Sequence, residues 1–166
     1  MEPRPKIKIT LRPIDKVMEV AGWLLLAATC ILAVYQYYTL PEIIPVHYNA
    51  SGVPDSYGSK KFLFFLPLLA LVLFIGMTWL NKYPHIFNYP VTITNENAEV
   101  QYRFATRMIR YMKMILAFIF CFVLIGGGLA ATGKVTKLGW WFIPLIVGLT
   151  VIPAIYAVIR SFRLNK

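Results

Sequence analysis

Four long apolar stretches are the feature that most constrains what this chain can fold into. Each holds about 20 residues, the length that an α-helix needs to cross a hydrocarbon core of about 30 Å. No Lys, Arg, Asp, Glu or His lies in the central part of any stretch. We therefore predict one all-α membrane domain over residues 1–166, a bundle of four transmembrane helices. The expected spans are residues 17–38, 62–80, 114–132 and 138–159.

The composition supports a membrane protein over a soluble one. Hydrophobic residues make up 58% of the chain, whereas soluble domains contain about 45–50%. The formal net charge of +10 would suggest nucleic-acid binding in a soluble protein. Beside transmembrane helices, basic residues serve first as topology signals and lipid contacts. We therefore expect the lipid bilayer, and no nucleic acid, as a partner.

Basic residues are distributed unevenly among the segments outside the four spans. Thirteen of the 17 Lys and Arg residues lie in the two chain ends and in the connection 81–113. By the positive-inside rule, both termini and this connection are expected to be cytoplasmic. The connections 41–61 and 133–137 then face outward.

The second half of the connection 81–113 has an amphipathic pattern that begins at Ala98. We predict a helix there that continues without a break into the third apolar stretch. Its apolar side would lie on the membrane surface or on a neighbouring helix, and its basic side would contact anionic lipid headgroups or a partner protein. The apolar side carries Phe104, Met108, Tyr111 and Ile115, and the basic side carries Arg103, Arg107 and Arg110.

The outward connection 41–61 is longer than a simple spacer between two helices requires. Ile44, Val46 and Tyr48 alternate with other residues as in a short strand. Many residues of types that favour turns follow them. A compact, hairpin-like cap over the outer end of the bundle is therefore expected. These turn formers are Asn49, Ser51, Gly52, Pro54, Asp55 and Gly58.

The run Ile44-Pro45-Val46-His47-Tyr48-Asn49 is followed by Gly52, Asp55, Gly58 and Lys60. This pattern resembles the signature of a bacterial domain of unknown function at the N-terminal end of SdpI-type membrane proteins. The resemblance covers the first two helices and their loop, and SdpI-type proteins have further helices. It implies a multi-pass protein of the bacterial cytoplasmic (inner) membrane. It also implies immunity to a secreted toxic peptide, and signalling by holding a repressor at the membrane.

The candidate site for a ligand or partner lies in the outward connection. His47 could contact a ligand, act as a pH-sensitive switch or bind a metal; alternatively, its imidazole could hydrogen-bond the turn at residues 49–52 and hold the cap. One His and one Asp fall short of a zinc site. Lys60 is expected to extend to the interface, or to pair with Asp55 or Glu42. The candidate residues are Pro45, His47, Asn49, Gly52, Asp55 and Lys60.

Motifs for catalysis are missing from the chain, so we expect no enzyme, catalytic residue, metal or cofactor. The favoured function is a non-enzymatic binding, sensing or immunity-like protein, whose outward loop recognises a peptide or protein. The alternative is an accessory or structural subunit of a larger membrane complex or a homo-oligomer, suggested by the small residues Gly126–Gly128 and Ala130. An enzyme or transporter that depends on His47 is the third possibility.

Overall fold

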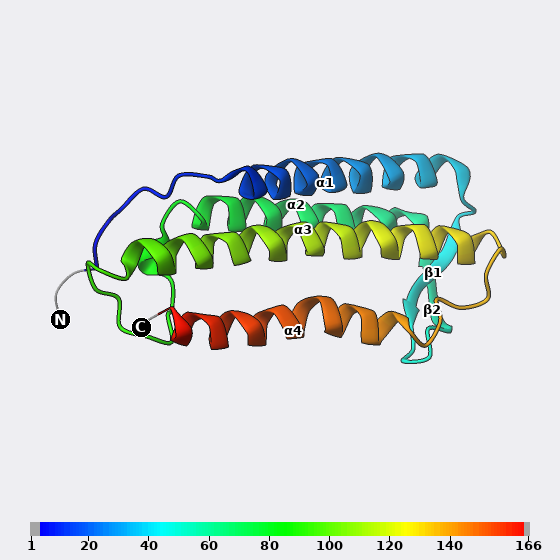
Figure 1. Ribbon diagram of the computed structural model, residues 1–166. Helices are drawn as coiled ribbons and strands as arrows, with labels where there is room; N and C mark the ends of the chain where they lie inside the picture. The colour runs from blue at the N-terminus through cyan, green and yellow to red at the C-terminus, as the bar shows by residue number, and fades with distance from the viewer. Residues whose placement is uncertain (1–3, 165–166) are drawn as a thin grey trace.

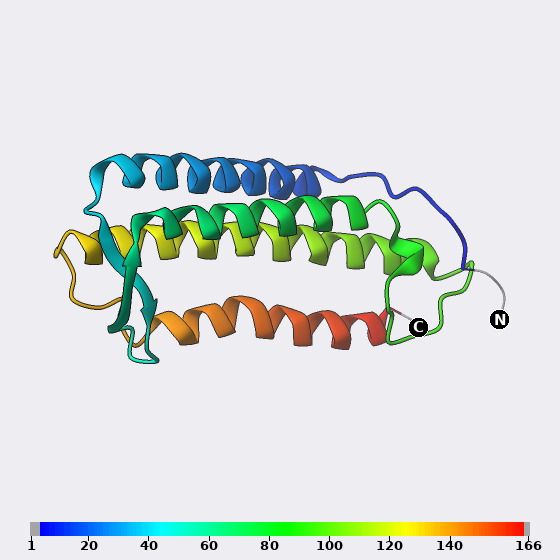
Figure 2. The same cartoon turned by 180° about the vertical axis from the view of Figure 1, so that it is seen from behind.

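The computed structural model of the protein describes residues 4–164 and consists mostly of helix, with a small β-hairpin at one end (Figures 1 and 2). Within these residues, four helices are long and apolar enough to cross a membrane, which confirms the predicted helical class. The second of them is counted with the short 3-10 helix η1 (Lys60–Phe64) that leads into it. The helices are α1 (Pro13–Thr39), α2 (Phe65–Leu80), α3 (Ala98–Ala131) and α4 (Phe142–Arg163).

Helix α3 is continuous over 34 residues, so the predicted uninterrupted helix from Ala98 into the third apolar stretch is confirmed. At 1.5 Å per residue it is about 51 Å long, well beyond a hydrocarbon core of about 30 Å. Its basic residues end at Lys113, and the remainder is apolar. The basic half of α3 therefore extends beyond the layer that its apolar half can span.

Helices α1, α2 and α3 pack together along their length, with α1 and α3 running in the same direction (Figures 1 and 2). Small residues allow the close approach. Ala33, Ala70 and Ala117 are at most 1% exposed. A Cβ atom added at Gly22 would lie 2.9 Å from the Phe74 ring, so α1 passes directly over this ring.

Helix α4 lies apart from α1 and α2 and packs mainly on α3 (Figure 1). Among the described residues, 0% of its most apolar stretch is buried. Polar contacts hold it near the chain ends, where the Ser161 hydroxyl donates to Gln101 Oε1 at 2.8 Å and Gln101 Nε2 donates to the Ser161 carbonyl at 2.9 Å. Such apolar exposure is unfavourable in water but not in lipid, because lipid chains are as apolar as these side chains.

The hairpin consists of the antiparallel strands β1 (Ile43–Tyr48) and β2 (Pro54–Ser59), and Pro45 lies opposite Tyr57. It crosses the bundle at the end away from the start of α1 and the end of α4 (Figures 1 and 2). The backbone N–H of Leu138, in the α3–α4 connection, donates to the Gly52 carbonyl at 2.8 Å. The hairpin, which forms most of the α1–α2 connection, is thus tied to the α3–α4 connection at this end.

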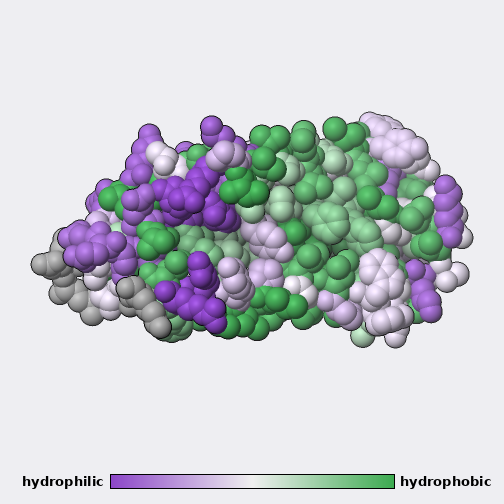
Figure 3. All heavy atoms as spheres, viewed as in Figure 1, coloured by the Kyte–Doolittle hydropathy of each residue, from purple (hydrophilic) through white to green (hydrophobic). Residues whose placement is uncertain are grey.

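At the opposite end, the segment before α1 runs over the α2–α3 connection, which contains the short helix η2 (Pro84–Ile86). The Arg4 guanidinium donates to the carbonyls of His85 and Phe87, at 3.2 and 2.6 Å. Figure 3 shows hydrophilic residues gathered at this end, with a mainly hydrophobic surface along the helices. We call this end of the bundle the basic end, and the opposite end, which carries β1 and β2, the hairpin end.

Candidate functional site

The turn of the hairpin is built by the side chain of Asn49. Its Oδ1 accepts the backbone N–H groups of Ser51 and Val53, at 3.0 and 3.1 Å. Gly52 has φ +74°, which disfavours other residues, and an added Cβ would lie 2.8 Å from the Gly139 nitrogen. Asn49 and Gly52, both predicted as binding residues, therefore have clear structural roles in shaping and docking the turn.

His47 and Asp55 meet across the two strands, with His47 Nδ1 and Asp55 Oδ1 2.5 Å apart. Their side chains are 68% and 41% exposed. The imidazole does not bond the turn at residues 49–52, because Asn49 supplies those hydrogen bonds; His47 instead bonds to Asp55 and so joins the two strands of the cap. The structure thus presents a polar pair on the accessible side of the hairpin.

Lys60 lies apart from this pair. Its ammonium is 2.8 Å from Glu42 Oε1 and 5.1 Å from the centre of the Tyr37 ring. Its backbone N–H also donates to the Glu42 carbonyl at 2.9 Å. Of the two pairings considered from the sequence, Lys60–Glu42 is the one formed, and it closes the base of the hairpin.

An apolar cavity of about 220 Å³ lies between the inner side of β1 and the helices. Pro45, Val46 and Tyr48 line it on the β1 side, and Gly127 of α3 lies opposite. The Tyr48 hydroxyl is buried and has no hydrogen-bond partner among residues 4–164. Burial raises the pKa of Tyr48, and the nearby Tyr57 contributes. The cavity is therefore lined mainly by apolar residues, and one of them, Tyr48, carries a buried hydroxyl without a partner in the described structure.

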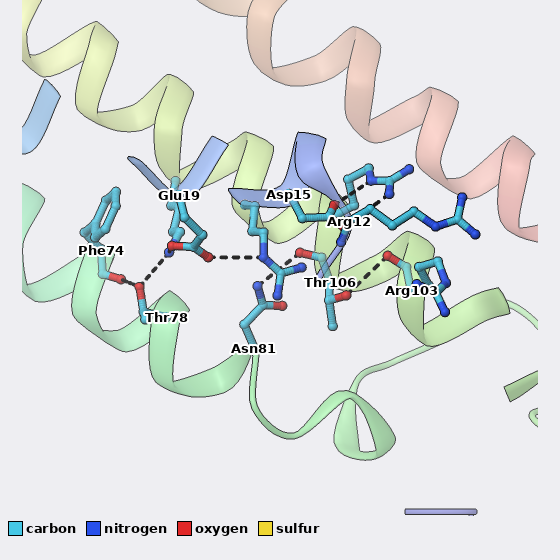
Figure 4. Close-up of polar contacts among 11 residues, drawn as sticks. Arg12, Asp15, Glu19, Phe74, Thr78, Asn81, Arg103 and Thr106 are labelled. Carbon is cyan, nitrogen blue, oxygen red and sulfur yellow. Dashed lines mark hydrogen bonds and ion pairs between the residues drawn. The ribbon is translucent and has the colours of Figure 1, made fainter. Parts of the chain in front are cut away.

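The basic end holds a network of charges between α1 and α3 (Figure 4). Arg107 donates to both carboxylate oxygens of Asp15, from Nε at 2.7 Å and from Nη2 at 3.2 Å. The same carboxylate accepts the backbone N–H of Arg12 at 2.9 Å, at the start of α1. A bidentate pair of this kind fixes orientation as well as distance.

Glu19 extends the network toward the apolar part of the bundle. It accepts from Arg110 at 3.1 Å and from Lys113 at 2.6 Å. The Lys113 side chain is 0% exposed, donates to the Thr78 hydroxyl at 2.7 Å and lies 4.4 Å from the centre of the Phe74 ring. One lysine thus joins α1, α2 and α3.

The three arginines predicted to contact lipid or a partner all have partners within the chain. Arg103 pairs with Glu99 and donates to the Thr10 carbonyl at 3.1 Å. Sequence reasoning treated this basic side as an outer surface and missed Asp15, Glu19 and Lys113. The available signal was spacing: the two acids are four residues apart, and Arg107, Arg110 and Lys113 follow at intervals of three. Headgroup contact by the arginines stays a prediction.

Chemically, the hairpin end offers an exposed imidazole–carboxylate pair and an apolar cavity, and the basic end offers paired charges. Within residues 4–164, no three His, Cys, Asp or Glu side chains are placed together to hold a metal ion. The four apolar helices of the described chain are, by length and composition, those of a multi-pass membrane protein.

Comparisons with known proteins found matches to part of this chain. Residues 24–71 match the profile of a domain of unknown function (DUF1648). An uncharacterized protein of Archaeoglobus fulgidus is 33% identical over 88 residues, which are 48% of this chain and 48% of that protein. The chain thus spans about half the length of this curated relative. No solved structure matches.

Proposed function

We propose that this protein is a non-enzymatic binding or sensing protein of the cytoplasmic membrane, and that its hairpin recognises a peptide ligand outside the cell. In this proposal the basic end is cytoplasmic, as the positive-inside rule requires. The hairpin end then faces the compartment from which a secreted peptide arrives.

One observation carries the proposal: contacts fix the hairpin at its base and at its turn, while its accessible side remains exposed and chemically mixed. The Lys60–Glu42 pair closes its base, and the Gly52–Leu138 hydrogen bond docks its turn. Ile43 and Tyr57 are 61% and 63% exposed, on the strands that carry His47 and Asp55. A preorganised surface loses little conformational entropy when it binds, which favours recognition over a purely structural cap.

The chemistry of the site favours an amphipathic ligand. Exposed apolar side chains suit the apolar side of a membrane-active peptide, and the His47–Asp55 pair suits its polar groups. The cavity beneath β1 could also receive one apolar side chain of the ligand. The residues that match the domain of unknown function, 24–71, include the whole hairpin. Together with the resemblance to SdpI-type proteins, this favours immunity to a toxic peptide as the particular function.

The test is survival of a toxin-sensitive bacterium that expresses the full chain and is exposed to a panel of membrane-active peptides. We expect protection against at least one peptide, and its loss in His47→Ala and Asp55→Asn. Glu96→Gln is the matched control, since it removes an exposed carboxylate at the opposite end of the molecule. Membrane abundance is measured for every variant.

Unchanged sensitivity across the panel would argue against immunity. Protection that persists at full strength in His47→Ala would remove both the proposed role of the pair and the alternative of an enzyme or transporter that depends on His47.

A second function, an accessory subunit of a larger membrane complex, is favoured by the position of α4. This helix packs mainly on α3 and leaves its apolar stretch unburied within the described chain. Purification in a mild detergent followed by mass spectrometry tests this alternative. A stoichiometric partner would support it, whereas a monomer without a partner would contradict it.

A further inference from the structure

A second pocket, of about 530 Å³, lies at the basic end beneath the segment that precedes α1. Its walls come from this segment, from the end of α2 with the following connection, and from α3. None of the described residues that line it is acidic. Its basic and amide residues are Lys6, Lys8, Lys82, His85, Arg110 and Asn81.

The positive charge of this pocket is largely uncompensated. Lys6, Lys8 and Lys82 are exposed residues, and their ammonium groups form no ion pair with any residue in the described part of the chain. Arg110 is buried, and it pairs with Glu19 through Nε. Within residues 4–164, the hydrogen bond of its guanidinium group is made by Nε, which leaves the terminal N–H groups available to a ligand. Cations gathered without a carboxylate repel one another, so an anion bound among them would be stabilised.

Asn81, which also lines the pocket, adds a hydrogen-bond acceptor without a partner in the described structure. Its Nδ2 donates to the Thr106 carbonyl at 3.0 Å, which fixes the amide. Its Oδ1 is buried and has no hydrogen-bond partner in the described structure. A buried acceptor without a donor is costly. A ligand whose hydroxyl reaches Oδ1 would therefore be stabilised by donating to it, as well as by its negative charge.

We infer that this pocket binds a phosphate ester that carries a free hydroxyl group, such as a glycerophosphate. The phosphate would lie among Lys6, Lys8, Lys82 and Arg110, and the hydroxyl would donate to Asn81 Oδ1. Arg110 lies one turn before the apolar half of α3, and Asn81 directly follows α2. The pocket therefore lies where a lipid headgroup meets the hydrocarbon layer. The same chemistry could come from a soluble phosphate ester.

The experiment measures ligand binding to the purified full-length protein in a neutral detergent, by native mass spectrometry and thermal shift. Phosphatidylglycerol is compared with phosphatidylmethanol, which has the same charge but no headgroup hydroxyl, and with zwitterionic phosphatidylcholine. Glycerol 1-phosphate is added as a soluble competitor. We expect phosphatidylglycerol to bind most tightly. Displacement by millimolar glycerol 1-phosphate would identify a soluble ligand, and its absence a lipid.

The variant Lys6→Gln/Lys82→Gln is compared with Lys134→Gln/Lys137→Gln, which removes the same charge at the hairpin end. All four lysines are exposed, so both proteins should fold. Each lysine lost from the pocket should weaken binding about 5-fold, so the first variant should bind about 25-fold more weakly. Equal weakening in both variants, equal affinity for phosphatidylmethanol, or no binding of either phosphate ester would overturn the inference.

Discussion

Gly128 of α3 shows how a single residue determines the distance between α1 and α3. Gln36 of α1 crosses to α3 and donates from Nε2 to the Leu124 carbonyl at 2.8 Å. A Cβ added at Gly128 would lie 2.2 Å from this nitrogen. The helix–helix hydrogen bond therefore depends on a missing side chain. From the sequence we interpreted the glycines here only as support for assembly into a membrane complex or a homo-oligomer.

We expect Gly128→Ala to lower the free energy of unfolding by about 1–3 kcal/mol, because Gln36 must move from its hydrogen bond. Thermal unfolding in detergent measures the change. Gly76→Ala in α2 is the control, since a Cβ there meets nothing within 4 Å. It should be neutral or stabilising by about 0.5–1 kcal/mol. Equal effects in the two variants would contradict the proposed contact.

The buried Lys113 leads to a second prediction at the scale of a single residue. Glu19→Gln leaves its ammonium without a carboxylate, and we expect a loss of about 3–5 kcal/mol in the free energy of unfolding. Glu99→Gln removes the partner of Arg103, but Glu99 is 67% exposed, so about 1 kcal/mol or less should be lost. Denaturant titration in mixed micelles would compare them. Recovery of stability in Glu19→Gln/Lys113→Met would show that the unpaired charge is the cause.

At the scale of elements, the hairpin depends on contacts that are distant in sequence. Its turn residue Gly52 accepts a hydrogen bond from Leu138 and lies against Gly139, in the α3–α4 connection. The alternation of Ile44, Val46 and Tyr48 predicted a strand, and β1 covers these residues. The docking could not be predicted, because it depends on a connection more than 80 residues away.

We expect Gly52→Ala to release the hairpin from the α3–α4 connection, because the added Cβ requires both a strained φ and the space occupied by Gly139. Hydrogen exchange of residues 43–59 should accelerate by roughly tenfold or more, which corresponds to about 1.4 kcal/mol. Gly133→Ala is the control, since its φ is +71° but no atom lies within 4 Å of its Cβ. If both variants accelerate exchange in the hairpin equally, the docking contact is not the cause.

For the whole molecule, the asymmetry of charge between the two ends leads to a prediction about topology. The basic end carries the start of α1, the end of α4 and the start of α3 (Figure 1). The positive-inside rule then predicts that a C-terminal tag is inaccessible to antibody or protease outside intact cells. A cysteine introduced at Ser56, in β2, should be labelled by a membrane-impermeant maleimide. An accessible C-terminal tag together with an unlabelled cysteine at position 56 would show that the hairpin end is cytoplasmic, and would contradict recognition of an extracellular ligand by the hairpin.

Hydropathy and spacing in one chain were enough to predict four membrane-spanning helices and the continuity of α3. These are local properties, because a helix satisfies its own backbone in lipid and its length follows from the apolar run. Which charges pair was decided by tertiary structure. Asp15 meets Arg107 and Glu19 meets Lys113 only because α1 packs beside α3 in the same direction. The helices bring together side chains more than 90 residues apart, and one-dimensional periodicity does not encode that proximity.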